Sequence, residues 1–197
     1  LNRLDYRPLT VSITGAAKYI KKVTTSDQME IRPKLSPDKK WLLVEAIGIK
    51  KGIADKAVLQ KINLSNSSRV ILTSLSSESV EGDWLPDQSA FVYSTNRLGT
   101  YTIVQSFGVL GNTAVKFISN PALGPARFPS VSPDGKDIAF SIYQSPKSNQ
   151  ICIVDLNGMN LRAFGPGWEP SWSPDGKKIL FTRRVGDFNH IFTMNVS

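Results

Sequence analysis

The chain has 197 residues, of which 41% are hydrophobic and 20% charged, and this length and composition are typical of a protein with one substantial hydrophobic core. No stretch approaches the roughly 18 apolar residues that a membrane-spanning helix needs, so we expect no membrane insertion. The single cysteine, Cys152, excludes an intrachain disulfide and a cysteine-cluster metal site. The formal net charge of +8 indicates an acidic partner, a polyanion, or solubility alone.

A short phrase centred on Pro-Asp recurs four times along the chain. It reads Ser-Pro-Asp-Lys at 36–39, Leu-Pro-Asp-Gln at 85–88, and Ser-Pro-Asp-Gly at 132–135 and 173–176. Its prolines stand 49, 47 and 41 residues apart, a period typical of repeat architectures. Proline and aspartate favour a type I turn, and a final glycine suits a left-handed position. Because Lys39 and Gln88 replace that glycine, and a left-handed backbone costs them more, we expect distorted turns there.

Short apolar runs around each turn predict four strands per repeat, which we name A to D in chain order. Strand A ends at Leu35, Trp84, Val131 and Trp172; strand B follows at 41–44, 91–93, 138–140 and 179–181; strand C lies at 58–62, 101–105, 151–155 and 191–195; and strand D lies at 69–73, 114–118 and 161–164. The B runs are continuously apolar, which predicts burial on both faces. Four antiparallel strands repeated in register predict an all-β fold, a β-propeller, rather than a sandwich.

The whole chain, 1–197, is predicted to be one propeller domain. Residues 9–24 are interpreted as a C–D strand pair of an incomplete blade, and the repeats occupy 25–75, 76–121, 122–165 and 166–197, the last without its fourth strand. Two arrangements remain open. Either a strand at 18–24 completes the last sheet and closes a small ring, or the chain is a segment of a larger ring.

The two C-terminal repeats carry a family resemblance. The strings PSVSPDGKDIAFSIY, from residue 129, and EPSWSPDGKKILFTRR, from residue 169, resemble the PD40, or WD40-like, repeat of TolB-type propellers. The repeats at 36 and 85 keep less of the pattern. Such proteins usually have six blades, which favours the segment over the closed small ring. The resemblance implies a periplasmic or exported protein, with the cytoplasm not excluded, and an envelope protein partner such as a peptidoglycan-associated lipoprotein.

Candidate binding residues lie in the B–C loops and at the start of the A strands, which share one face of a propeller. The predicted channel-mouth residues are Arg32, Glu81, Asp83, Phe128, Trp168 and Glu169, and the predicted basic rim consists of Lys50, Lys51, Arg97, Lys147, Arg183 and Arg184. Charges in the D–A connections are mostly acidic, so we expect a basic rim around an acidic mouth. Trp84 and Trp172 are interpreted as packing between blades.

No motif indicates a catalytic centre. His190 is the one histidine and is interpreted as a surface or packing residue, and neither a G-x-S-x-G motif nor a phosphate-binding loop is present. The repeated aspartates are interpreted as turn formers, so we expect no metal, cofactor or enzymatic activity. No basic run is interleaved with aromatic residues, which argues against nucleic acid binding.

We therefore predict a non-enzymatic, protein-binding scaffold. The alternative is a propeller accessory to an enzyme such as a prolyl-oligopeptidase-like serine peptidase or a polysaccharide lyase. The oligomeric state stays open.

Overall fold

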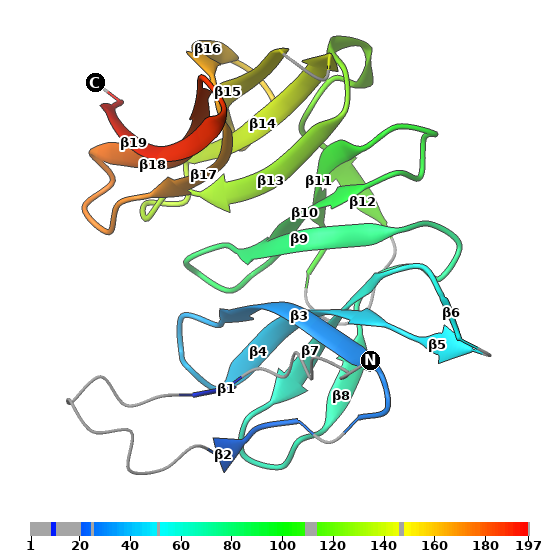
Figure 1. Cartoon of the computed structure of the whole chain (residues 1–197). Coiled ribbons are helices and arrows are strands. Elements are labelled where there is room, and N and C mark those ends of the chain that lie inside the picture. The colour runs from blue at the N-terminus through cyan, green and yellow to red at the C-terminus, as the bar shows by residue number, and fades with distance from the viewer. Residues whose placement is uncertain are drawn as a thin grey trace.

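The computed structural model describes residues 9–10, 21–24, 26–50, 52–108, 114–145 and 148–196. Three four-stranded antiparallel sheets and one three-stranded sheet follow one another in chain order. Figure 1 shows them as successive blades along an arc, from the blue and cyan blade 1 to the orange and red blade 4. The predicted all-β propeller arrangement is confirmed.

Each blade is a meander of neighbouring strands. Blade 1 comprises β3 (Met29–Leu35), β4 (Trp41–Ile47), β7 (Val58–Asn63) and β8 (Arg69–Ile71); blade 2 comprises β9 (Ser79–Trp84), β10 (Phe91–Thr95), β11 (Thr102–Ser106) and β12 (Val115–Phe117). Blade 3 comprises β13 (Ala126–Val131), β14 (Asp137–Ser145), β15 (Ser148–Asp155) and β16 (Arg162–Pro166); blade 4 comprises β17 (Trp168–Trp172), β18 (Lys178–Val185) and β19 (Phe188–Asn195). A 3₁₀ turn (Pro121–Leu123) precedes blade 3.

Two short strand pairs stand outside the blades. The hairpin of β5 (Ile49–Lys50) and β6 (Ile53–Ala54) lies in the B–C loop of blade 1 and was not predicted. Near the N-terminus, β1 (Leu9–Thr10) pairs with β2 (Lys21–Lys22). Most of the predicted C–D pair at 9–24 falls outside the described residues. Within them, β2 pairs with β1 alone and no strand joins the outer edge of β19.

The hydrophobic core is divided into layers between consecutive blades. Between blades 1 and 2 lie Leu43, Leu59, Leu72, Trp84, Phe91, Tyr93 and Val104; between blades 3 and 4 lie Ala139, Ile151, Ile153, Ile179 and Phe181. A similar layer joins blades 2 and 3 and includes Cys152, whose burial raises its thiol pKa to about 11. Strand β10 is buried on both faces, as predicted. Strand β18 is not, because Leu180 points away from blade 3 and is 46% exposed.

The two tryptophans assigned to interblade packing have that role. Trp84 is 7% exposed within the layer between blades 1 and 2, and its indole Nε1 donates to the Lys34 carbonyl at 3.2 Å. Trp172 packs against the layer between blades 3 and 4, and its Nε1 donates to the Ser130 carbonyl at 3.0 Å. Each indole N–H is therefore satisfied by the blade before it.

The Pro-Asp turns form in all four blades, and the expected distortion of the first two is wrong. Lys39 and Gln88 adopt φ of 60° and 61°, beside 74° and 69° for Gly135 and Gly176. The amide of each donates to the carbonyl three residues earlier over 2.8–2.9 Å. The turn geometry is the same with or without glycine, because the flanking strands fix it. The non-glycine residues instead carry the conformational cost, about 1–2 kcal/mol each.

Replacement of Lys39 by glycine should therefore stabilise the protein. We expect Lys39→Gly to raise the free energy of unfolding by up to about 1 kcal/mol, since relief of the left-handed backbone exceeds the entropic cost of glycine. The neighbouring Lys40 is also exposed and has no positive φ, so Lys40→Gly should lower stability by about 0.5–1 kcal/mol. Urea denaturation of both variants measures the difference, and equal effects at the two positions would contradict it.

Candidate binding face

Apart from Asp83, the predicted mouth and rim residues that the structure describes lie at one end of the blades. Neighbouring strands within each blade are antiparallel, so the D–A connections and the B–C loops lie at the end opposite the Pro-Asp turns. We call this end the mouth face. The A strands, β3, β9, β13 and β17, start there.

Each A strand contains an irregularity at the same position. The pairing register of the A and B strands shifts beside Arg32, Glu81, Phe128 and Glu169, and these residues have φ of 49°, 60°, 57° and 55°. All four were predicted mouth residues. Bulky residues hold a left-handed backbone only where the surrounding structure imposes it.

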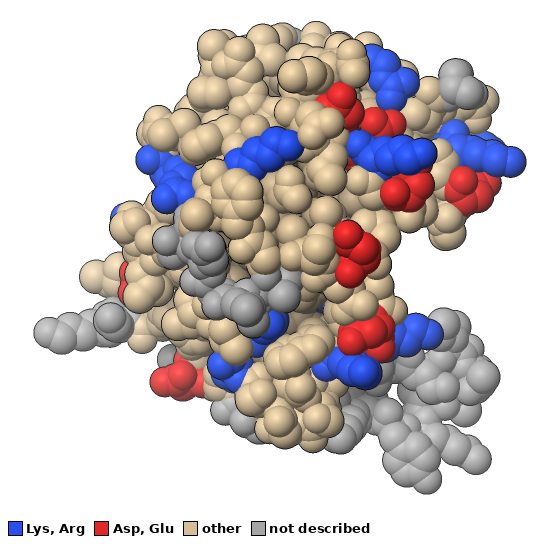
Figure 2. Space-filling view, turned by 180° about the vertical axis from the view of Figure 1, so that it is seen from behind, with Lys and Arg blue, Asp and Glu red and all other residues tan. Residues whose placement is uncertain are grey.

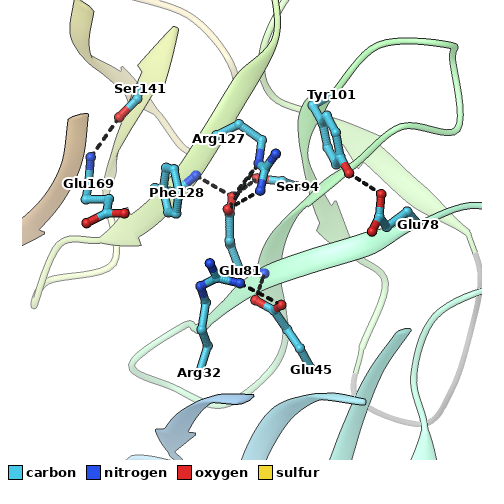
Figure 3. Close-up of polar contacts among 10 residues, drawn as sticks. All are labelled: Arg32, Glu45, Glu78, Glu81, Ser94, Tyr101, Arg127, Phe128, Ser141 and Glu169. Carbon is cyan, nitrogen blue, oxygen red and sulfur yellow. Dashed lines mark hydrogen bonds and ion pairs between the residues drawn. The ribbon is translucent and has the colours of Figure 1, made fainter. Parts of the chain in front are cut away.

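In blades 2, 3 and 4, a hydrogen bond to the preceding blade holds this conformation. The Glu81 amide donates to Oε1 of Glu45 in blade 1 at 2.7 Å. The Phe128 amide donates to Oε2 of Glu81 in blade 2 at 2.7 Å, and the Glu169 amide donates to Oγ of Ser141 in blade 3 at 3.1 Å. The bulge turns each amide out of its own sheet and toward its neighbour (Figure 3).

Arginines complete the coordination of the two carboxylates. Arg127 donates from Nε to both Glu81 oxygens at 3.0 Å and from Nη2 to Oε1 at 2.5 Å, and Ser94 Oγ donates to Oε2 at 3.0 Å. Arg32 Nη1 donates to Glu45 Oε2 at 2.9 Å. Glu45 and Glu81 are 1% and 6% exposed. Both carboxylates are buried and paired with arginines, so they add nothing to the acidic mouth surface expected from the sequence.

Tyr101 and Glu78 also help to hold Arg127 in place. The Arg127 guanidinium lies 4.2 Å from the centre of the Tyr101 ring, and the Tyr101 hydroxyl donates to the Glu78 carboxylate (Figure 3). Burial and the Glu78 carboxylate raise the pKa of Tyr101 to about 12. The hydroxyl therefore stays protonated at neutral pH and remains a donor.

The predicted mouth residues meet in a small pocket at the centre of the mouth face. Arg32, Glu81, Phe128 and Glu169 line it together with Lys34, and its volume is 120 Å³. The Glu169 side chain is exposed, and Arg32 lies 5.9 Å from the Phe128 ring centre. All four blades thus contribute to one pocket, which we call the central pocket.

Asp83 and Trp168 do not line the central pocket. The Asp83 side chain is 17% exposed, accepts the Val131 amide at 2.9 Å and lies 3.5 Å from Lys34 Nζ. Burial raises the pKa of Asp83. Its contacts join blade 2 to blades 1 and 3. Trp168 lines a larger groove of 580 Å³ between blades 3 and 4, with Arg183 and Arg184, which we call the blade 3–4 groove.

The remaining rim residues are less clustered. Arg97 is exposed in the B–C loop of blade 2, whereas Lys51, Lys147 and the side chain of Lys50 lie outside the described residues. In Figure 2, basic and acidic side chains are interspersed over the face that is shown. Within the described part of the chain, no group of three or more His, Cys, Asp or Glu is arranged to hold a metal ion, and no helix has the length and apolar character to span a bilayer.

Sequence reasoning missed the partners of the mouth residues, Glu45, Ser94, Arg127 and Ser141, and Tyr101, which supports Arg127. One signal could have located the bulges. A proline or glycine stands four residues before each turn proline, at Pro33, Gly82, Pro129 and Pro170. Neither residue type fits a regular central strand, so the recurrence marks a bulge.

Loss of one partner from the buried Glu81–Arg127 pair should be costly. We expect Arg127→Met to lower the free energy of unfolding by about 3 kcal/mol, because it leaves a buried carboxylate without its counter-ion. The double variant Glu81→Gln, Arg127→Met should cost less than the sum of the single changes. Arg162 forms a more exposed pair with Asp137 at 3.3 Å, so Arg162→Met, the matched control, should cost under about 1 kcal/mol. Equal losses at both arginines would refute a special role for the central pair.

Burial makes the Glu45 carboxyl a source of pH dependence. Burial raises its pKa above the ordinary 4.5, although Arg32 and the Glu81 amide act in the opposite direction. The folded protein therefore holds this proton more tightly than the unfolded chain does. As the pH falls from above that raised pKa toward 4.5, the stability of the wild type should rise relative to Glu45→Gln, which lacks the titrating group. Denaturation at a series of pH values measures this difference, and a difference that is flat or shrinks on acidification contradicts the assignment.

Comparison with known proteins places the fold. No family model and no curated protein matches the sequence. Among solved structures, the chain is similar to a protein assigned as TolB from Agrobacterium tumefaciens, with a TM-score of 0.79 and 20% identity over 95% of this chain and 69% of that one. It is similar to TolB from Acinetobacter baumannii, with a TM-score of 0.67 and 24% identity over 90% of this chain and 42% of that one.

An enzyme shares the architecture too. A puromycin-hydrolyzing peptidase from Mycobacterium tuberculosis aligns with a TM-score of 0.70 and 13% identity over 90% of this chain and 29% of that one. In each comparison, the chain corresponds to a part of a longer protein. The fold of the chain is that of a TolB-like β-propeller.

Proposed function

We propose that the protein is a non-enzymatic scaffold that binds a protein partner through its mouth face. The observation that carries the proposal is the convergence of all four blades on the central pocket. Phe128 and Glu169 stand there on backbone fixed by hydrogen bonds, and the Arg32 side chain is held by Glu45. Loops and strand ends held in this way by a rigid scaffold are common binding surfaces. The TolB-like fold agrees with this reading.

The size and chemistry of the central pocket favour a protein ligand. Its volume of 120 Å³ is well below the roughly 300–1,000 Å³ of small-molecule sites, and fits one inserted side chain. Arginine and aromatic residues are frequent anchors of protein interfaces. The buried glutamates hold arginines and backbone amides, which leaves them unsuited to acid–base catalysis.

The TolB-like fold also supports a location for this function. We infer a periplasmic or exported protein whose partner belongs to the cell envelope, and a peptidoglycan-associated lipoprotein is the partner that the resemblance favours. A second function is supported by the likeness to a puromycin-hydrolyzing peptidase: a propeller that accompanies a catalytic domain. In that case, the mouth face would contact the catalytic domain rather than an envelope protein.

Substitutions at the central pocket test the scaffold. We expect Phe128→Ala and Glu169→Lys to weaken binding of purified peptidoglycan-associated lipoprotein from the same organism by about tenfold each, as loss of an interface anchor does. Isothermal titration calorimetry measures the affinity. Lys177 is exposed in the turn at the opposite end of blade 4, so Lys177→Glu is the control and should leave affinity unchanged. Absence of binding by the wild type would reject this partner, and undiminished binding by both pocket variants would reject the central pocket as its site.

A further inference from the structure

The blade 3–4 groove has the features of a second binding site on the mouth face. It lies where the D–A connection of blade 4 meets the ends of β15, β18 and β19, and its volume is 580 Å³. Asn149, Trp168, Arg183, Arg184 and Asn189 are among the residues that line it. We propose that this groove binds an extended acidic peptide segment, with a carboxylate on Arg183. The proposal rests on the scaffold function and specifies the chemistry of the partner.

Arg183 differs from the arginines that hold the fold together. Arg32, Arg69 and Arg127 each form an ion pair with a buried glutamate. Arg183 is held by neutral groups instead: its Nε donates to the Pro166 carbonyl at 2.6 Å, and its guanidinium lies 5.1 Å and 5.2 Å from the ring centres of Phe181 and Phe192.

The charge of Arg183 is therefore positioned without being neutralised. No carboxylate of the described residues forms an ion pair with it. Its Nη atoms remain to donate, because the backbone contact uses Nε. A guanidinium that is already ordered loses little entropy when it binds a carboxylate through two parallel hydrogen bonds.

Arg184 adds a second positive charge at the solvent side of the groove. Its Nε donates to the Gly186 carbonyl at 3.0 Å. Its Nη2 lies 3.6 Å from Asp187, whose side chain is 94% exposed. An ion pair this exposed is weak, so an incoming carboxylate can replace Asp187 at small cost. The two neighbouring arginines thus favour a ligand with more than one acidic group.

Asn149, which lines the groove, carries an acceptor that needs a donor. Asn149 Oδ1 is buried, and no group of the described residues donates to it. A buried polar atom without a partner costs about 1–3 kcal/mol, which a ligand N–H recovers when the Asn149 amide turns toward the groove. A peptide supplies backbone N–H groups beside its acidic side chains, and the half-buried Trp168 ring offers an apolar surface for its aliphatic parts.

These groups distinguish a peptide from other anions. A simple ion such as sulfate would pair with the arginines and leave Asn149 without a donor. An acidic saccharide brings several hydroxyls that all need partners, while Pro166, Gly167 and Gly186 give part of the lining no polar side chain. An acidic peptide satisfies the arginines and Asn149 together.

The test uses the full chain and fluorescence anisotropy with a labelled peptide of alternating glutamate and alanine. We expect this peptide to bind, with an affinity that falls as salt is added, and its glutamine–alanine counterpart not to bind. Arg183→Gln should weaken binding about tenfold or more. Lys177→Gln, which removes one positive charge at the opposite end of blade 4, should have no effect beyond about twofold.

A second arginine variant and two other ligands separate a folding defect from a loss of peptide binding. If Arg183→Gln fails to fold, as judged by its circular dichroism spectrum and melting temperature, Arg184→Gln at the exposed position replaces it and should weaken binding severalfold. Equal binding of the neutral peptide, undiminished binding by the arginine variant, or binding of oligogalacturonate but not of the acidic peptide would overturn the proposal. If the arginine variants bind the protein partner normally while Phe128→Ala does not, the groove proposal fails and the scaffold proposal stands.

Discussion

The fold depends on a backbone amide that is turned out of its own strand. In blades 2, 3 and 4, the left-handed residue at the start of strand A donates its N–H to a polar side chain of the blade before it. A regular strand would keep that amide in its own sheet, where it could not join two blades. The unfavourable φ is thus the local cost of a hydrogen bond between two blades. This hydrogen bond helps to set the angle and distance between neighbouring sheets, and the hydrophobic layers fill the space between them.

The need for these interblade acceptors explains why some arginines pair with buried glutamates and others do not. The amides need acceptors at a position that packing makes dry, and Glu45 and Glu81 supply them. A buried carboxylate needs a counter-ion, which Arg32 and Arg127 provide. In blade 3 the acceptor is the neutral Ser141, which needs no counter-ion. Arg183 of blade 4 contacts the Pro166 carbonyl and two aromatic rings, and it forms no ion pair with a carboxylate of the described residues.

The sequence predicts the architecture better than it predicts the mouth face. The spacing of the Pro-Asp phrase and the apolar runs after it are local signals, and they located the turns, most strands and the packing role of Trp84 and Trp172. Glu81 was predicted as a mouth residue, but its pairing with Arg127 joins residues 46 positions apart and cannot be read from local pattern. The distortion expected at Lys39 was wrong because tertiary contacts, rather than the preference of one residue, decide that φ.

The amide and indole hydrogen bonds between blades also have a direction. The amides of Glu81, Phe128 and Glu169, and the indoles of Trp84 and Trp172, are donors in a later blade, and their acceptors lie in the blade before. The acceptor side chains stand on strands that an earlier blade completes by itself. The acceptors of each blade are therefore in place before the next blade, with its donors, has been synthesised. Assembly can follow synthesis from the N-terminal to the C-terminal end, as in other arrays stabilised by nearest neighbours.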